Sequence, residues 1–223
     1  MSSDERSRFE ISPEIGTVAA LFRPVADARA VLVLAHGAGA GQKHPFMVAT
    51  AKGLASRRIS VVTFDFPYMR ARRHVPDKAP VLEAAFRDAI DATRGWCGAT
   101  GVVIGGKSMG GRMATHLGAQ GLDGLLGIVA LGYPLHPPGR PDKPRTEHLP
   151  SIRVPVLIVQ GERDTFGTPD ELKPVIATMK TKTTLHVVPG GDHSLAVRGR
   201  QKDVAFEGVL DVVARWIHAN QPA

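Results

Sequence analysis

The sequence is short of cysteine, of long apolar runs and of aromatic residues, and each shortage excludes a class of protein. Its single cysteine, Cys97, rules out an internal disulfide and a cluster of thiolate metal ligands. No apolar run reaches the roughly 20 residues that a membrane-spanning helix needs. The first residues, MSSDERSRFEISPE, are charged and lack the apolar stretch of a signal peptide. We therefore expect a cytoplasmic protein that does not contact a membrane.

The scarcity of aromatic residues, 5% of the chain, leaves few side chains on which nucleic-acid bases could stack. The net charge of +7 invites a nucleic-acid partner, but the basic residues are scattered. Local groups occur at residues 57–58, 70–74 and 198–202, and no helix-like segment carries a continuous basic stripe. The charge therefore predicts a basic, soluble surface and no nucleic-acid partner.

Short apolar runs alternate with segments of helical periodicity along most of the chain. The predicted strands are residues 17–22, 30–35, 60–65, 101–106, 127–131, 154–160 and 184–188. Residues 81–90 and 206–217 each repeat apolar residues at helical spacing, which is typical of helices packed on a core. With 43% apolar residues, the pattern predicts one α/β domain over residues 1–223, in which a mostly parallel sheet carries helices on both faces. We expect residues 1–14 to be a loose N-terminal segment.

Residues 101–111, GVVIGGKSMGG, match two unrelated motifs. Residues 106–110 read as G-x-S-x-G, the nucleophile elbow of an α/β-hydrolase, whereas residues 101–108 read as G-x-x-x-x-G-K-S, a phosphate-binding P-loop. The four variable residues of a P-loop must form a loop, but residues 102–104 are β-branched and apolar and predict a buried strand. This favours the elbow, in which Ser108 projects from the end of the strand as the nucleophile. A glycine-rich turn without chemistry is the alternative.

A small-residue loop and the start of a helix supply the expected oxyanion hole. Residues 109–119 suit a helix that begins right after Ser108, so that the Met109 amide points at the reaction site. After the strand 30–35 comes HGAGAG, whose small residues let a backbone amide approach a reacting oxygen. We nominate the amides of Ala38 and Met109, and a plain glycine-rich connection is the alternative.

An acid and a histidine follow two further strands. GERD follows the strand 154–160 and supplies Asp164, and PGGDHS follows the strand 184–188 and supplies His193. In an open α/β sheet, ligands bind at the carboxyl ends of the strands. The order Ser108, Asp164, His193 is that of α/β-hydrolases, with His193 as the base and Asp164 as the acid that orients it. Three other acids compete for that role: Glu162, Asp170 and Asp192.

Basic residues near the predicted site are candidates for holding a substrate. Arg72 and Arg73 follow the strand 60–65 and are placed to overhang the site, where arginine suits a carboxylate or phosphate; an exposed basic loop is the alternative. We expect Lys107, just before the serine, either to line the pocket or to pair with an acid. The proline-rich segment 134–150 is short, which predicts a minimal cap and esters of small or soluble acids as substrates.

Several longer segments resemble the α/β-hydrolase superfamily. They are LAHGAGAG (34–41), FDFPYMRARRHVPDKAPVLEAAFRDAI (64–90), GGKSMGGRMA (105–114), GYPLHPPGRPDKPRTEHL (132–149), VQGERDTFG (159–167) and GGDHSL (190–195). More narrowly, the chain is similar to the small dienelactone-hydrolase-like branch shared with testis-expressed hydrolase-like proteins and the third subunit of the NSL chromatin complex. It carries serine where dienelactone hydrolases use cysteine. The resemblance implies a compact α/β-hydrolase fold with little cap and a complete triad, and it implies no particular substrate.

The sequence therefore predicts a serine hydrolase that forms an acyl-enzyme on a small-molecule ester and needs neither a metal nor another cofactor. A non-catalytic interaction platform on the same fold is the alternative, because the NSL-subunit relatives act within an assembly. A nucleotide-binding P-loop protein is a weaker alternative, since the strand 127–131 ends without the acid that would hold magnesium. The number of subunits is not predicted.

Overall fold

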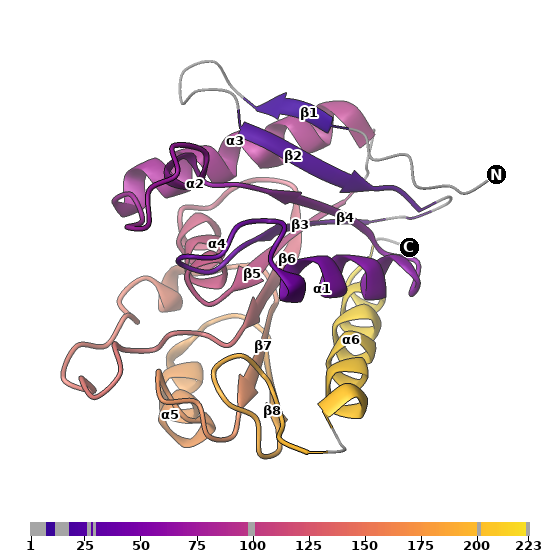
Figure 1. Ribbon diagram of the computed structural model, residues 1–223. Coiled ribbons are helices and arrows are strands. Elements are labelled where there is room, and N and C mark those ends of the chain that lie inside the picture. Colours follow the sequence, from indigo (N-terminus) through magenta and orange to yellow (C-terminus); the bar gives the residue numbers. More distant parts are fainter. Residues whose placement is uncertain are drawn as a thin grey trace.

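The structure is a computed structural model that describes residues 8–11, 18–25, 28, 30–97, 101–199 and 202–221. Its centre is an eight-stranded sheet (Figure 1). The strands are β1 (Arg8–Ile11), β2 (Val18–Arg23), β3 (Val31–Ala35), β4 (Ser60–Phe64), β5 (Val102–Lys107), β6 (Leu125–Leu131), β7 (Val156–Gly161) and β8 (Thr183–Val188). Their order across the sheet is β1-β2-β4-β3-β5-β6-β7-β8. β2 is antiparallel to both of its neighbours, and all pairs from β4 to β8 are parallel.

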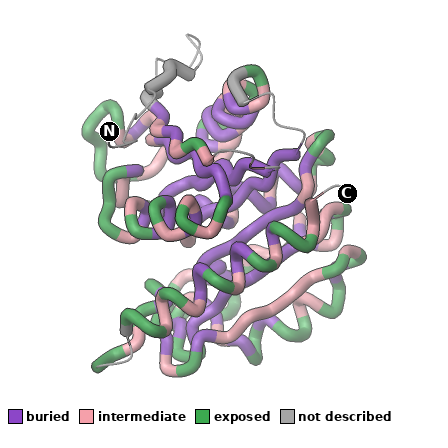
Figure 2. The backbone as a smooth tube through the Cα atoms, turned by 90° about the vertical axis from the view of Figure 1, so that its right-hand side faces the viewer, coloured by how far each residue is buried: buried purple, intermediate pink, exposed green. Residues whose placement is uncertain are grey.

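Helices cover both faces of the sheet. They are α1 (Pro45–Ala55), α2 (Pro67–Arg70), α3 (Ala79–Cys97), α4 (Met109–Ala119), the 3-10 helix η1 (Leu149–Ser151), α5 (Pro169–Thr178) and α6 (Lys202–Ala219). α1 and α6 pack on one face and α3, α4 and α5 on the other (Figure 1). Along β3, Val31 and Val33 enter the core beneath α3 and α4, while Leu32 and Leu34 enter the core beneath α1 and α6. Figure 2 shows the same layers as buried strands between helices with exposed outer sides.

The mostly parallel sheet, its two helical layers and seven of its strands agree with the sequence-based prediction, each strand to within two residues at its ends. β1 was not predicted, because it lies in the segment expected to be loose. That expectation is wrong for residues 8–11, which pair antiparallel with β2 and satisfy backbone groups along its edge. Residues 1–7 and 12–14 lie outside the described residues.

The central strands direct their carboxyl ends toward one edge of the sheet, where the nominated residues gather. β5 ends at Lys107 and α4 begins at Met109, as the elbow prediction requires. Between β6 and β7 the chain is described without a gap and forms only η1, so the cap is minimal, as expected. Among the described residues, no helix combines the length and the apolar character needed to cross a membrane.

Candidate active site

Ser108 occupies the one-residue turn between β5 and α4. Its φ of 51° lies in the left-handed region, which a non-glycine residue adopts at a cost of about 1–3 kcal/mol. The flanking glycines make the turn possible, because a Cβ at Gly106 would lie 2.6 Å from the Ala35 carbonyl oxygen and 2.5 Å from the Gly110 backbone. The strand, turn and helix of an elbow are therefore present. The P-loop interpretation is wrong, since β5 occupies residues that a P-loop needs as loop.

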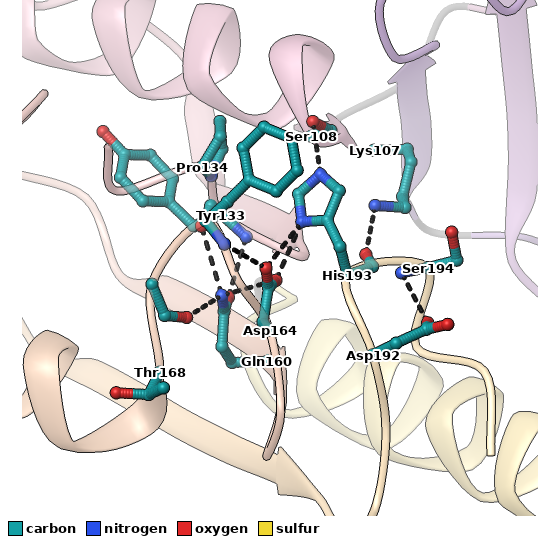
Figure 3. Close-up of polar contacts among 12 residues, drawn as sticks. Lys107, Ser108, Tyr133, Pro134, Gln160, Asp164, Thr168, Asp192, His193 and Ser194 are labelled. Carbon is teal, nitrogen blue, oxygen red and sulfur yellow. Dashed lines mark hydrogen bonds and ion pairs between the residues drawn. The ribbon is translucent and has the colours of Figure 1, made fainter. Parts of the chain in front are cut away.

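His193 connects Ser108 to Asp164 (Figure 3). Its Nε2 lies 2.8 Å from Ser108 Oγ, and its Nδ1 lies 2.9 and 2.8 Å from the Oδ1 and Oδ2 atoms of Asp164. With the proton assigned to Nδ1, the ring donates to the carboxylate and accepts from the serine hydroxyl. Asp164 follows β7 and is buried, whereas His193 follows β8 and is partly exposed. The three nominated residues thus form one hydrogen-bonded chain.

The three competing acids have other partners. Asp192 and Glu162 accept hydrogen bonds from backbone amides within residues 190–196. Asp170 forms an ion pair with an exposed lysine of α5. The structure therefore brings Asp164, and none of these three, to the histidine ring.

Gln160, near the end of β7, holds the Asp164 carboxylate and was not predicted from the sequence. Its Nε2 donates to Asp164 Oδ2 and to the Gly167 carbonyl oxygen, both at 2.8 Å, and its Oε1 accepts from the Tyr133 amide at 2.8 Å. The Phe166 amide donates to Asp164 Oδ1, also at 2.8 Å. Gln160 is fully buried, so these bonds replace water for every polar group involved. A polar residue in the otherwise apolar run VLIVQ is the signal that could have found it.

The Phe166 ring stacks on the His193 ring. Their centroids lie 4.0 Å apart, and the two planes are inclined by 24°. The stacking limits rotation of the imidazole and places an aromatic face where the ring would become cationic. The sequence contains no signal for this contact, because it depends on how the turn after Asp164 folds back over the histidine loop.

Lys107, the last residue of β5, forms a hydrogen bond to the loop that carries His193. Its Nζ donates to the His193 carbonyl oxygen at 2.5 Å (Figure 3). Burial lowers the pKa of Lys107 to about 8, while the carboxylates of Asp164 and Asp192 act in the opposite direction. Lys107 lines the cavity beside Ser108, and its direct partner is a carbonyl oxygen rather than an acid.

A cavity of about 330 Å³ opens beside Ser108. Its lining residues are Gly37, Ala38, Ala40, His44, Phe46, Met47, Lys107, Ser108, Phe166, His193 and Ser194. Arg72 and Arg73, expected at the site, are not among the lining residues of this cavity. Arg72 is exposed, and Arg73 pairs with Asp77 at 2.7 Å. A second cavity, of about 780 Å³, lies around residues 118–125 at the far end of α4 and contains none of the nominated residues.

The loop after β3 lies directly against Ser108. A Cβ at Gly37 would lie 3.6 Å from Ser108 Cβ, so only a small residue fits comfortably between them. Within the described part of the chain, the amides of Ala38 and Met109 donate to no other group. Among the described residues, both N–H groups therefore have no hydrogen-bond acceptor.

His36 fixes this loop from inside the protein. Its fully buried ring lies 2.8 Å from the Gly37 carbonyl oxygen through Nδ1 and accepts from the Phe66 amide at 3.1 Å through Nε2. Burial lowers the pKa of His36, which keeps the ring neutral and able to accept. The Gly39 amide donates to the Tyr68 hydroxyl at 3.2 Å and holds the next turn of the loop. The loop is therefore positioned before any ligand binds.

Solved structures share this architecture at low sequence identity. An esterase from Pyrococcus furiosus has a TM-score of 0.78 at 18% identity, with 98% of this chain and 92% of that chain covered. An α/β serine hydrolase without a lid from Xanthomonas campestris has a TM-score of 0.76 at 19% identity, with 100% and 98% covered. A dienelactone hydrolase from Anabaena variabilis has a TM-score of 0.73 at 19% identity, with 98% and 100% covered.

At these identities the likeness to solved structures shows the fold alone. The sequence itself matches a family model described as an alpha/beta hydrolase domain over residues 28–220. This match spans the sheet from β3 to β8 together with Ser108, Asp164 and His193. The chain therefore belongs to the alpha/beta hydrolase domain family, as its resemblance predicted.

Proposed function

We propose that this protein is a serine hydrolase in which Ser108 is the nucleophile, His193 the general base and Asp164 the acid that orients the base. The observation that carries the proposal is the hydrogen-bonded chain, with 2.8 Å between Ser108 Oγ and His193 Nε2 and 2.8 Å between His193 Nδ1 and Asp164 Oδ2. A nucleophile within reach of a base that a third group orients is the arrangement that activates a serine.

The reaction follows from the positions of these groups. Ser108 Oγ attacks the substrate carbonyl carbon while its proton passes to His193 Nε2, and Asp164 stabilises the imidazolium that forms. The tetrahedral intermediate collapses when His193 returns the proton to the leaving alcohol, which leaves an acyl group on Ser108. Water, deprotonated by His193, then attacks the acyl group and releases the acid.

The amides of Ala38 and Met109 are proposed as the oxyanion hole. They come from the loop after β3 and from the first residue of α4, and neither donates to another described group. Each donor of this kind contributes about 3 kcal/mol to stabilising the transition state. The loop anchored by His36 keeps the first donor in place, so little reorganisation accompanies the reaction.

Esters of small or soluble carboxylic acids are the proposed substrates. The cavity of about 330 Å³ is near the lower end of the roughly 300–1,000 Å³ found for ligand pockets. Phe46, Met47 and Phe166 give it apolar walls, and the minimal cap offers no helical cover for a long acyl chain. Substrate binding by Arg72 and Arg73 gains no support from the geometry, and Lys107 is the cationic side chain that reaches the cavity.

Labelling with a fluorophosphonate probe tests the proposal. The parent protein is expected to be labelled and Ser108→Ala is expected to lose the label. Ser194→Ala is the matched control, because Ser194 lines the same cavity and, among the described residues, its hydroxyl forms no hydrogen bond with His193. An unlabelled parent that is folded by circular dichroism would contradict the proposal and favour the non-catalytic platform.

A series of ester substrates tests the proposed substrate class. We expect kcat/KM to be highest for acetate and butyrate esters and to fall as the acyl chain outgrows the cavity. A preference for long-chain lipid esters would contradict the assignment to small acids while leaving the nucleophile assignment intact.

A further inference from the structure

Two arginines lie on elements that contact each other, α4 and the segment between β6 and η1, at a seam that the proposed hydrolysis does not use. Arg112 lies on α4, and Arg145 lies within residues 132–148. The seam is closed by two polar contacts. The Tyr133 hydroxyl donates to the Arg145 carbonyl oxygen at 2.6 Å. On α4, Thr115 Oγ1 lies 2.9 Å from Nε2 of His148, which belongs to residues 132–148.

Arg112 is partly buried, and the structure describes no counter-charge for its guanidinium. Within the described residues, its side chain forms no ion pair and no hydrogen bond, and its Nε is buried without a partner. Arg145 is little better satisfied, because its guanidinium makes a single long bond, 3.5 Å from Nη1 to the Pro134 carbonyl oxygen. Burying a charged group without a partner is costly, and such groups normally pair or bind a ligand.

The positive charge of Arg112 acts on the Arg145 guanidinium. Partial burial lowers the pKa of Arg145, and the positive charge of Arg112 lowers it further. Like charges in partly buried positions repel, so Arg112 makes the charge of Arg145 harder to accommodate. The seam therefore concentrates positive charge that the described residues do not neutralise.

Neither His148 nor Tyr133 offers Arg112 a negative charge. Burial lowers the pKa of His148 to about 3, with electrostatic contributions from His116 and Arg112 adding to the effect, so His148 is neutral at pH 7. Burial raises the pKa of Tyr133, which keeps its hydroxyl protonated. The nearby carboxylate of Glu83 is already engaged by His116 Nδ1 at 2.7 Å.

We infer that Arg112 and Arg145 form a binding site for one small oxyanion, a phosphate or carboxylate group, at the seam between α4 and residues 132–148. A guanidinium presents its N–H donors in a planar fork that fits two oxygens of such a group. One oxyanion contacting both forks supplies the missing counter-charge and a partner for the buried Nε of Arg112. Neutral Tyr133 and His148 border the site without opposing an anion.

The site is distinct from the cavity beside the nucleophile. Neither arginine lines that cavity, although the Arg112 amide donates to the Ser108 carbonyl oxygen at 3.0 Å, one turn along α4. Anion binding is therefore measurable without any hydrolysis. Using Ser108→Ala protein for every measurement separates this inference from the proposed enzymatic function.

Titration calorimetry at pH 7.5 in 0.15 M sodium chloride tests the site, with inorganic phosphate and sodium acetate as two separate probes. We expect saturable binding of at least one probe, one ion per chain, and the tighter probe identifies whether the site takes a phosphate or a carboxylate group. Arg112→Met and Arg145→Met are each expected to weaken binding at least tenfold. Absence of saturable binding by both probes would overturn the inference.

Arg140→Met is the matched control. Arg140 belongs to the same segment and carries the same charge, but it is exposed and pairs with Asp142 at 3.1 Å. We expect this variant to bind like the parent, and an equal weakening would show that only the net charge matters. Thermal melting covers the case in which Arg112→Met folds poorly, because phosphate or acetate should raise the Tm of the parent and of Arg140→Met but not that of Arg145→Met.

Discussion

Two polar regions meet at α4, and they differ in how their charges are matched. Around Asp164 the carboxylate oxygens accept from His193, Gln160 and the Phe166 amide. Around Arg112 the guanidinium has no such partner among the described residues. A fully bonded network holds its members in one geometry, as catalysis by preorganised groups requires. A network with an unmatched charge can instead be completed by a ligand. Arg112 lies on α4, and the Asp164 network reaches Ser108 at the start of the same helix.

Replacing the acid of the matched region, Asp164→Asn, should cause the largest effect. An amide in this position cannot hold the Nδ1 proton of His193 as a carboxylate does, so kcat is expected to fall about 10⁴-fold with the fold intact. Steady-state hydrolysis of a short-chain ester measures it. Asp192→Asn is the control, since Asp192 accepts only backbone amides and its asparagine keeps an oxygen for them. Similar losses in both variants would show that Asp164 has no special part in the network.

Gln160→Leu breaks the same network one step further from the nucleophile. The buried Tyr133 amide and Gly167 carbonyl lose their partner, so the free energy of unfolding should fall by about 1–3 kcal/mol. A smaller drop in kcat should accompany it, because Asp164 Oδ2 is no longer held. Urea unfolding and ester hydrolysis measure the two effects. Gln120→Leu, on an exposed residue, is the control, and an equal loss of stability there would count against a role for burial.

Lys107→Met should change the pH dependence of stability. Burial lowers the folded-state pKa of Lys107 to about 8 from 10.5, so between these values the unfolded chain binds more protons than the folded one. The contribution of Lys107 to the free energy of unfolding therefore rises as the pH increases from about 8 to 10.5, and the Lys107→Met variant lacks that rise. Urea unfolding at pH 7.5 and 9.5 measures the difference. The exposed Lys143→Met should keep the parent's pH dependence.

Loss of Lys107 should also slow hydrolysis, because the bond from its Nζ to the His193 carbonyl oxygen holds the loop that carries the base. We expect kcat to fall with KM little changed. Lys107→Arg, which keeps a donor, should recover part of the rate. If the methionine and arginine variants are equally slow, the hydrogen bond is not the reason for the loss.

Arg112→Met should have the smallest effect on stability, provided that phosphate and carboxylate buffers are absent. Replacing an unmatched, partly buried charge with an apolar side chain of similar length is neutral or stabilising. We expect a change within about 1 kcal/mol, clearly less than for Gln160→Leu. Urea unfolding of the two variants side by side measures the contrast. Equal losses would erase the distinction between the matched and unmatched regions.

The sequence was sufficient for the sheet and for the residues nominated for catalysis because both follow from the ends of strands. Each apolar run predicts a strand, and in an open α/β sheet the chemistry lies just beyond the carboxyl ends. Ser108, Asp164 and His193 each come within a few residues of the end of a predicted strand, so their gathering at one edge could be derived. β1 was not predicted, because a strand of four residues has too short an apolar pattern to be distinguished from a loop.

The supporting contacts could not be derived, because they join side chains to partners that no local pattern reveals. Lys107 bonds a main-chain carbonyl 86 positions away, and a carbonyl has no signature in a sequence. Phe166 stacks on His193 only through the fold of a turn. The juxtaposition of Arg112 and Arg145 likewise depends on the path of residues 132–148 back to α4.

β8 ends the sheet, and five of its six residues are only half buried. The loop that carries His193 begins directly after this strand, while Ser108 sits at the centre of the sheet. Edge strands open locally at a lower free energy than central ones. Under the proposed mechanism, fraying of β8 would therefore withdraw the base and return Ser108 to the reactivity of an ordinary hydroxyl, although the elbow itself is unchanged. On heating, the reactivity of this serine should disappear before the sheet melts, so that inactivation reports on the edge of the molecule rather than on its core.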